Sequence, residues 1–278
     1  MLSFYVMKKL TSSTYFKLIF GSSLVCSCIV FIIFLIENRP SLSRDFDVPT
    51  MKYEVKFPTN LPEVKQIVQV LSQYKKEHMN YVIILFGSAY VFKQSFGIPG
   101  SFLLNITAGA LFGVPIAFFL VSLLTGVGAT CCYLMSRYFG RELVERYFPR
   151  KISQLRKLIE ANESGLFFYL MFLRLFPMTP NWLLNIASPL INVPLHYFFF
   201  SVFFGLMPYN FICVQTGNIL YDISSLDSVF TPAVLAKMAC AATVTLLPGV
   251  LIRYSKYRQA NILPDGRIVP DSQEIKID

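Results

Sequence analysis

Carboxylates are scarce in this sequence, and the longest apolar stretches contain none. The chain has 16 Asp and Glu residues against 25 Lys and Arg. No acid lies between Glu77 and Glu142, or between Glu163 and Asp222. These stretches therefore hold no pair of carboxylates for acid–base catalysis and no relay of carboxyl groups for proton coupling.

Histidine is nearly missing as well, with only His78 and His196 in 278 residues. All six cysteines fall inside apolar segments, and no zinc-type spacing includes a histidine. We expect free thiols, no metal site and no cofactor. With no Ser–His–Asp arrangement and no basic–aromatic array, the sequence indicates neither an enzyme nor a nucleic-acid-binding protein.

Apolar residues make up 54% of the chain and charged residues only 15%. A mean hydropathy of +0.53 is too high for a soluble domain of this size and is typical of a multi-pass membrane protein. We expect an all-α integral membrane protein with full transmembrane helices at 18–36, 114–136, 197–215 and 233–252. A cleaved signal peptide is the alternative for 18–36, but the run is long and no small-x-small cleavage site follows it.

Two further apolar regions look like copies of each other. In each, a cation stands six residues before a proline, and Leu-Leu-Asn-Ile follows: Lys93 precedes Pro99, and Arg174 precedes Pro180. The apolar runs before the cations, 81–92 and 166–173, are too short to cross a bilayer as helices, and we expect Lys93-Gln94-Ser95 and Arg174 to interrupt them. Chance similarity is the alternative. We expect helical hairpins at 81–112 and 166–194, broken at Pro99, Gly100, Pro177 and Pro180.

Charge predicts the topology. The loop 137–165 carries seven cations against four acids, and the loop 217–231 carries no cation. With cytosolic N- and C-termini, four spans and two re-entrant hairpins, every segment obeys the positive-inside tendency. The first hairpin then enters from the lumen and the second from the cytosol, which makes an inverted repeat. We expect three regions: 1–80 (N-terminus, anchor helix and a lumenal segment with a helix at 63–77), the repeat at 81–220, and the last helix and tail at 221–278.

The basic loop predicts one amphipathic helix. Ile152, Leu155, Leu158 and Ile159 share a face, with cations around much of the rest. The helix could lie at the membrane interface or serve as a solvated connector, and the loop could recruit protein partners.

Each hairpin break combines a cation with the start of a helix. Ser101 and Asn181 are good N-cap residues, and a helix N-terminus favours a phosphate group. We expect membrane phospholipids to be the partners, with their headgroups passing along Lys93, Ser101, Asn105, Arg174, Asn181 and Asn185. The alternatives are that Lys93 snorkels to an interface, that Arg174 caps its own half-helix, and that the asparagines bridge broken backbone.

Several motifs together resemble a known family. They are Phe96-Gly97-Ile98-Pro99-Gly100-Ser101, Gly126-Val127-Gly128-Ala129-Thr130, Phe172-Leu173-Arg174-Leu175-Phe176-Pro177-Met178-Thr179-Pro180-Asn181-Trp182 and Pro208-Tyr209-Asn210. Over residues 61–252 the chain resembles the transmembrane protein 41 family, in its A branch, within the VTT-domain (DedA-like) superfamily.

The resemblance implies a multi-pass protein of the endoplasmic reticulum with two re-entrant loops. It also implies energy-independent phospholipid scrambling that supports autophagosome or lipoprotein formation. Bacterial relatives resemble proton-driven lipid-carrier flippases with membrane acids and a second Arg. Here Pro180 stands where that Arg would be, and the acids are absent from the first hairpin, so passive movement fits better. The alternatives are an ion-coupled transporter of a lipid carrier or anionic solute, and a non-transporting membrane scaffold.

Overall fold

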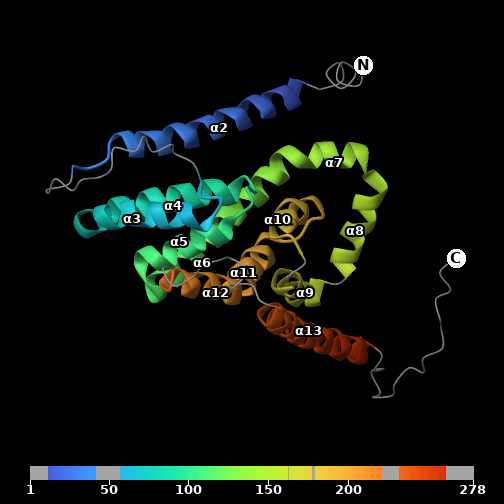
Figure 1. Ribbon diagram of the computed structural model, residues 1–278. Helices are drawn as coiled ribbons and strands as arrows, with labels where there is room; N and C mark the ends of the chain where they lie inside the picture. Colours follow the sequence, from blue (N-terminus) through green and yellow to red (C-terminus); the bar gives the residue numbers. More distant parts are fainter. Residues whose placement is uncertain (1–11, 42–56, 162, 177–178, 221–231, 261–278) are drawn as a thin grey trace.

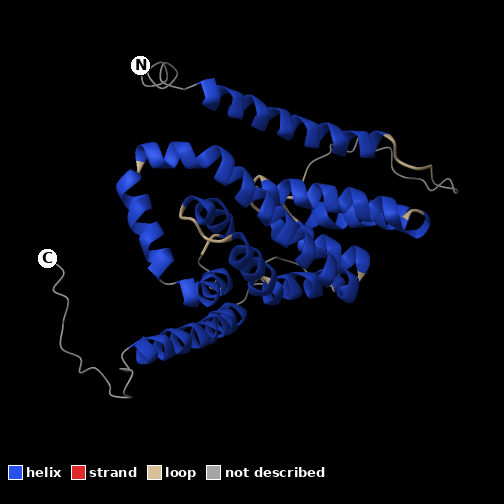
Figure 2. Ribbon diagram, turned by 180° about the vertical axis from the view of Figure 1, so that it is seen from behind, coloured by secondary structure: helices blue, strands red, loops and turns tan. Residues whose placement is uncertain are grey.

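The computed structural model describes residues 12–41, 57–161, 163–176, 179–220 and 232–260. Within these ranges every regular element is a helix and there is no strand (Figure 2), so the all-helical class is confirmed. The helices are α2 Ser12–Glu37, α3 Leu61–Glu77, α4 Met79–Ser95, α5 Ser101–Phe112, α6 Val114–Met135, the π-helical turn η1 Ser136–Gly140, α7 Arg141–Tyr147, α8 Pro149–Ala161, α9 Glu163–Leu175, α10 Asn181–Leu190, α11 Leu195–Gly205, α12 Met207–Asn218 and α13 Pro232–Ala260.

Three helical segments are long and apolar enough to cross a membrane: Ile19–Glu37, Val114–Gly140 and Leu195–Asn218. They correspond to the first three predicted spans. The third is interrupted at Leu206, between α11 and α12, where a proline enters the first turn of α12. The fourth predicted span, 233–252, is not confirmed: α13 covers it, but its described apolar part is only Ala242–Leu251.

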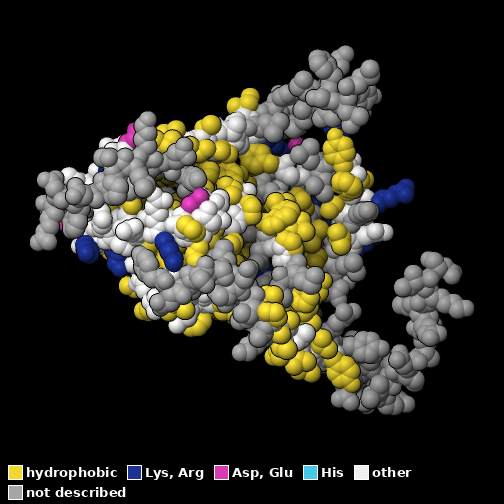
Figure 3. Space-filling model, viewed as in Figure 1, with side chains coloured by type: hydrophobic (Ala, Val, Ile, Leu, Met, Phe, Trp, Pro, Cys, Tyr) yellow, Lys and Arg dark blue, Asp and Glu magenta, His cyan; other side chains and the backbone are white. Residues whose placement is uncertain are grey.

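The outer surface agrees with a membrane protein. Apolar side chains gather over the middle and lower right of the face in Figure 3, where few charged side chains are visible. In Figures 1 and 2, α2 and α13 lie at opposite margins of the bundle, and the two hairpins and α6, α11 and α12 lie between them. All six cysteines are free.

The first hairpin consists of α4 and α5, which fold back on each other. The hydroxyl of Tyr90 donates to Oδ1 of Asn105 at 2.9 Å, and the rings of Phe86 and Phe112 lie 5.6 Å apart. The predicted interruption at residue 93 is wrong, since α4 continues for 17 residues, or about 25 Å. Lys and Gln are good helix formers, so the helix ends only where glycine and proline arrive at 97–100.

The second hairpin consists of α9 and α10. Its break at 176–180 is also set by proline, with Pro180 directly before α10; Pro177 lies outside the described residues. α9 packs closely against α11 because Gly205 has no side chain. A Cβ there would lie 3.2 Å from Cβ of Arg174. α9 also packs along α13.

The two halves of the molecule meet where α5 packs against α12. A Cβ on Gly109 would lie 2.0 Å from the carbonyl oxygen of Val214, and one on Gly217 would lie 2.1 Å from that of Ile106. Two backbones can approach this closely only where both helices present glycine. This contact fixes α5, the second arm of the first hairpin, against α12.

The predicted helix at 63–77 is confirmed as α3. Asn60 caps it by accepting a hydrogen bond from the backbone N–H of Glu63 at 2.9 Å. Val64 and Val68 are buried against the first hairpin, and the ammonium of Lys75 donates to a carbonyl oxygen at the end of α5. α3 therefore covers the open end of that hairpin.

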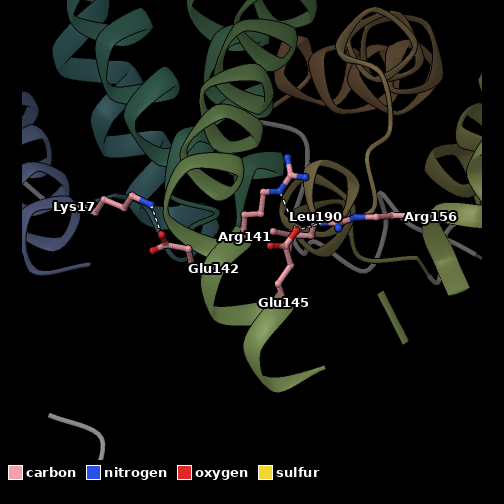
Figure 4. A network of polar contacts seen from close by, with 6 residues as sticks. All are labelled: Lys17, Arg141, Glu142, Glu145, Arg156 and Leu190. Carbon is pink, nitrogen blue, oxygen red and sulfur yellow. Dashed lines mark hydrogen bonds and ion pairs between the residues drawn. The ribbon is translucent and has the colours of Figure 1, made fainter. Parts of the chain in front are cut away.

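The basic loop folds as an elbow of two helices, α7 and α8, beside the second hairpin. Arg156 Nη2 donates to Glu145 at 2.6 Å and to the carbonyl oxygen of Leu190 at 2.9 Å, and Arg141 also donates to Glu145 at 3.0 Å (Figure 4). Arg156, and then Arg141, hold the pKa of Glu145 below its ordinary value by these hydrogen bonds. The elbow is thereby fastened to the last carbonyl of α10.

The amphipathic face of α8 turns partly inward. Ile152 is buried, and Ile159 packs on the core around α9 and α11, whereas Leu155 is 43% exposed. Leu158 lies outside the described side chains. α8 therefore packs part of its apolar face on the core around α9 and α11 and leaves Leu155 exposed.

Candidate functional site

The guanidinium of Arg174 is buried between the second hairpin and α11. Its Nη1 donates to Oδ1 of Asn185 at 3.1 Å and to Oδ1 of Asn181 at 3.5 Å. Its Nε donates to the hydroxyl of Ser201 at 3.2 Å, and its Cζ lies 4.8 Å from the ring centre of Phe198. Three polar side chains and one aromatic ring therefore surround a cation that is only 3% exposed.

One nitrogen of this guanidinium has no partner. Nη2 of Arg174 is buried without a hydrogen bond, and no ion pair within the described residues includes Arg174. A buried charge with an unused N–H group is unfavourable until an anion or another acceptor reaches it. Arginine presents its N–H groups as a fork that matches phosphate oxygens. The site can therefore accept an oxyanion.

Lys93 holds the matching place in the first hairpin, in the last turn of α4. Its side chain is buried at 2% exposure, so it does not extend to the surface. The ammonium lies 5.1 Å from the ring centre of Phe57 and 3.2 Å from the position of a Cβ on Gly100. Gly100 has φ of 91°, so both the backbone and the approach of the ammonium require glycine there. Within the described residues no carboxylate pairs with Lys93.

Asn105 belongs to a buried polar network that joins four helices. Its Oδ1 accepts from Tyr90, and its Nδ2 donates to Oδ1 of Asn210 at 3.0 Å. The hydroxyl of Tyr90 also lies 2.7 Å from that of Thr125. Both polar ends of the Asn105 amide are thus engaged inside the core, while Nδ2 of Asn210 has no partner.

Ser101 and Asn181 are not N-caps, contrary to the prediction. Each is the first helical residue, and Gly100 and Pro180 stand at the cap positions without a side-chain hydrogen bond. The reason is that Gly100 and Pro180 supply the backbone angles of the turn themselves. The hydroxyl of Ser101 instead donates to Gln94 at 3.0 Å, across the first break.

The structure brings together three of the six predicted path residues, Arg174, Asn181 and Asn185. Lys93 and Ser101 lie at the other break, and Asn105 lies in the polar network. No hydrogen bond among the described residues links the two breaks directly. The residues of the predicted route therefore fall into three separate polar groups within an apolar protein: the Arg174 cluster, the first break and the Asn105 network.

Sequence reasoning missed four contributors: Ser201, Phe198, Tyr90 and Asn210. The repeat itself carried a signal for the first. Ser201 and Ser122 correspond because each stands four residues before one of the matched glycines, Gly205 and Gly126. Both serines are buried, and Ser122 Oγ has no partner. A buried serine repeated on the helix after each hairpin is a pattern that sequence alone could have revealed.

Comparison with known proteins places this architecture in a family. The VTT domain model matches residues 98–219, which include the second break and most of the first. The Transmembrane protein 41 homolog of Drosophila melanogaster is 38% identical over 243 residues, which cover 87% of this chain and 72% of that protein. This chain belongs to the transmembrane protein 41 family.

Vertebrate members of the transmembrane protein 41 family match over similar lengths. Transmembrane protein 41B of Danio rerio is 35% identical over 80% of this chain and 77% of its own length. The human Transmembrane protein 41B is 34% identical over 82% of this chain and 77% of its own length. No solved structure gives a significant match. The family names and the apolar helices agree that the chain is a membrane protein.

Proposed function

We propose that this protein is an energy-independent phospholipid scramblase of the endoplasmic reticulum membrane. The observation that carries the proposal is the buried guanidinium of Arg174, with one nitrogen unpaired, at the break of a membrane hairpin. A second buried cation, Lys93, holds the matching place in the other hairpin. The phosphate of a membrane phospholipid is an oxyanion that matches this guanidinium, and the lipid tails stay in the hydrocarbon while the headgroup passes.

In the proposed topology both hairpins are re-entrant and four helices cross the bilayer. The N- and C-termini lie in the cytosol, so the two breaks approach the membrane interior from opposite leaflets. Each break offers a cation and a helix start, which lowers the free energy of a phosphate inside the hydrocarbon. Movement in both directions then follows the lipid gradient, and redistribution of lipid could supply autophagosome or lipoprotein formation.

Coupled transport has less support. A proton-driven carrier needs a group that changes charge inside the membrane, and the stretches between Glu77 and Glu142 and between Glu163 and Asp222 contain no carboxylate. A non-transporting scaffold would use Arg174 only to hold the second hairpin together. A transport assay distinguishes a scaffold of this kind from a scramblase.

The test uses the purified full chain in liposomes that carry a trace of fluorescent phospholipid. A membrane-impermeant reductant bleaches about half of the label in sealed vesicles, because one leaflet is protected. With the protein, bleaching should approach completion. Arg174→Gln should slow the bleaching of the label in the protected leaflet. Arg150→Gln, which removes an exposed cation of α8, should not slow it. Bleaching equal to that of protein-free vesicles would exclude scrambling.

The orientation has its own test. Asn162 forms an N-x-S/T sequon in the loop that we place in the cytosol. In cells we expect no glycan on it, even in a variant with a consensus Thr at position 164. Sugar attached at this site would overturn the topology, whatever the transport assay shows.

A further inference from the structure

Helix α2 is held against the bundle at its two ends. Near its C-terminal end, the hydroxyl of Tyr81 donates to the carbonyl oxygen of Leu35 at 2.9 Å. Near its N-terminal end, the ammonium of Lys17 lies 3.0 Å from Glu142 and 5.5 Å from the ring centre of Tyr138. Figures 1 and 2 show α2 running alongside the bundle between these points.

Between the two attachments an apolar groove of 810 Å³ separates α2 from α4 and α6. Leu24 and Phe31 of α2 line one wall, and Ile84, Phe96 and Leu134 line the other. The few polar atoms that line the groove are poorly placed to bind water molecules. The hydroxyl of Ser88, for example, is already bonded within its own helix at 2.7 Å. An apolar cavity without two to four available polar partners does not hold ordered water.

We propose that this groove binds one acyl chain of a phospholipid. The groove lies beside Ile19–Glu37, the most hydropathic of the membrane-length helices, and therefore at hydrocarbon depth. It follows α4 from Ile83 to Phe96, a length of about 20 Å at about 1.5 Å per residue. One leaflet fills about half of the ~30 Å hydrocarbon core, so a single chain fits along it.

Closure of α2 onto α4 would be the other way to remove this space. The attachments at Leu35 and Lys17 oppose it, because both must break or stretch for the middle of α2 to move inward. An unfilled groove would deprive its walls of dispersion contacts. A flexible hydrocarbon chain restores those contacts without disturbing either attachment.

The groove also reaches the first hairpin break. Ser95 and Phe96, the residues directly before that break, line it. Lys17 lies toward the same end, since α2 runs antiparallel to α4. A lipid held here would have its tail beside the first hairpin and its headgroup near Lys17. This lipid site is independent of scrambling, and the protein could hold a lipid without moving it.

The test uses the full chain in phosphatidylcholine vesicles with a trace of phosphatidylcholine that carries a diazirine on one acyl chain. After photolysis, adducts are mapped by mass spectrometry. We expect several-fold more adduct on groove residues of α2, α4 and α6 than on the lipid-exposed face around Leu123 of α6. Gly87→Phe places a ring in the groove, where a Cβ has only an ordinary contact at 3.6 Å, and should remove this excess.

Leu123→Phe is the matched control: it adds the same ring one residue from the groove-lining Leu124 and should leave the excess unchanged. Ser88→Leu provides a second obstruction should Gly87→Phe fail to fold. Equal labelling of the groove and the Leu123 face would overturn the proposal, and so would an absence of groove adducts. Neither result depends on the bleaching assay, so failure of the groove and failure of scrambling are distinguishable.

Discussion

The most informative perturbation is Arg174→Met, which removes the buried charge and keeps a side chain of similar length. The variant loses two good hydrogen bonds from a charged donor, to Asn185 and Ser201, each worth about 1.5–3 kcal/mol. It also relieves the burial of a charge, which costs about 2.5–3.5 kcal/mol at the centre of a membrane helix. The lost hydrogen bonds total about 3–6 kcal/mol and the relieved burial offsets about 2.5–3.5 kcal/mol of that, so we expect a net destabilisation of about 0–3 kcal/mol.

The effect on transport should be much larger. A phosphate oxygen about 4 Å from the guanidinium gains about 4 kcal/mol at an effective dielectric constant of about 20. Since about 1.4 kcal/mol corresponds to a tenfold change in rate, full loss of this attraction would slow lipid passage about a thousandfold. With water screening part of the charge, we expect a loss of at least about tenfold.

The assay is the bleaching of the protected leaflet, paired with thermal unfolding of the same detergent-purified sample. Arg174→Lys should fall between wild type and Arg174→Met, because it keeps the charge and loses the fork. Arg174→Met that unfolds near the wild-type temperature and scrambles at the wild-type rate would refute the reasoning. If Arg174→Met loses both its fold and its transport, Arg174→Lys becomes the deciding variant. A purely structural role of Arg174 predicts that Arg174→Lys loses stability and transport rate to the same degree.

Three further predictions concern the framework. Gly109→Ala should prevent stable folding, because its Cβ would meet a backbone carbonyl of α12 at 2.0 Å, whereas Gly87→Ala should unfold at or above the wild-type temperature. Tyr90→Phe should lower the free energy of unfolding by about 1–3 kcal/mol, since it leaves two buried partners short of a hydrogen bond; an unchanged melting temperature would contradict the polar network. The contact of Glu145 with Arg156 should stabilise the elbow above the ordinary carboxyl pKa of about 4.3 and be lost as pH falls through the lowered pKa. The protection factors of the α8 amides, which correct for the slower intrinsic hydrogen exchange at low pH, should then fall on acidification in wild type, and Glu145→Gln should show this lower protection already at neutral pH.

Much of the architecture was predictable because its signals are local. Apolar runs of sufficient length predicted three of the membrane-length helices. Pro99 and Gly100 predicted the first hairpin break, and Pro180 predicted the second. The end of α4 was misjudged because a charged residue was taken as an interruption. The helix passes through Lys93, whose ammonium finds space beside Gly100 at the break itself.

The candidate site was only partly predictable. Arg174, Asn181 and Asn185 do meet, as their shared spacing around one break suggested. Asn105 looked equivalent to Asn185 in sequence but bonds to Tyr90 and to Asn210, which is 105 residues away. No local pattern reports such a pairing, because it depends on how closely α5 and α12 approach.

By itself, the sequence determined the membrane class, the helical class and the places where the chain turns back, since hydropathy, proline and glycine act within a few residues. Only the tertiary structure decided which buried polar groups are satisfied. It pairs Asn105 within the core and leaves one nitrogen of Arg174 without a partner, and it holds one end of α2 against α4 while leaving a groove between the rest of the two helices. Those outcomes follow from the packing of distant helices, which sets the distance between donors and acceptors far apart in the chain.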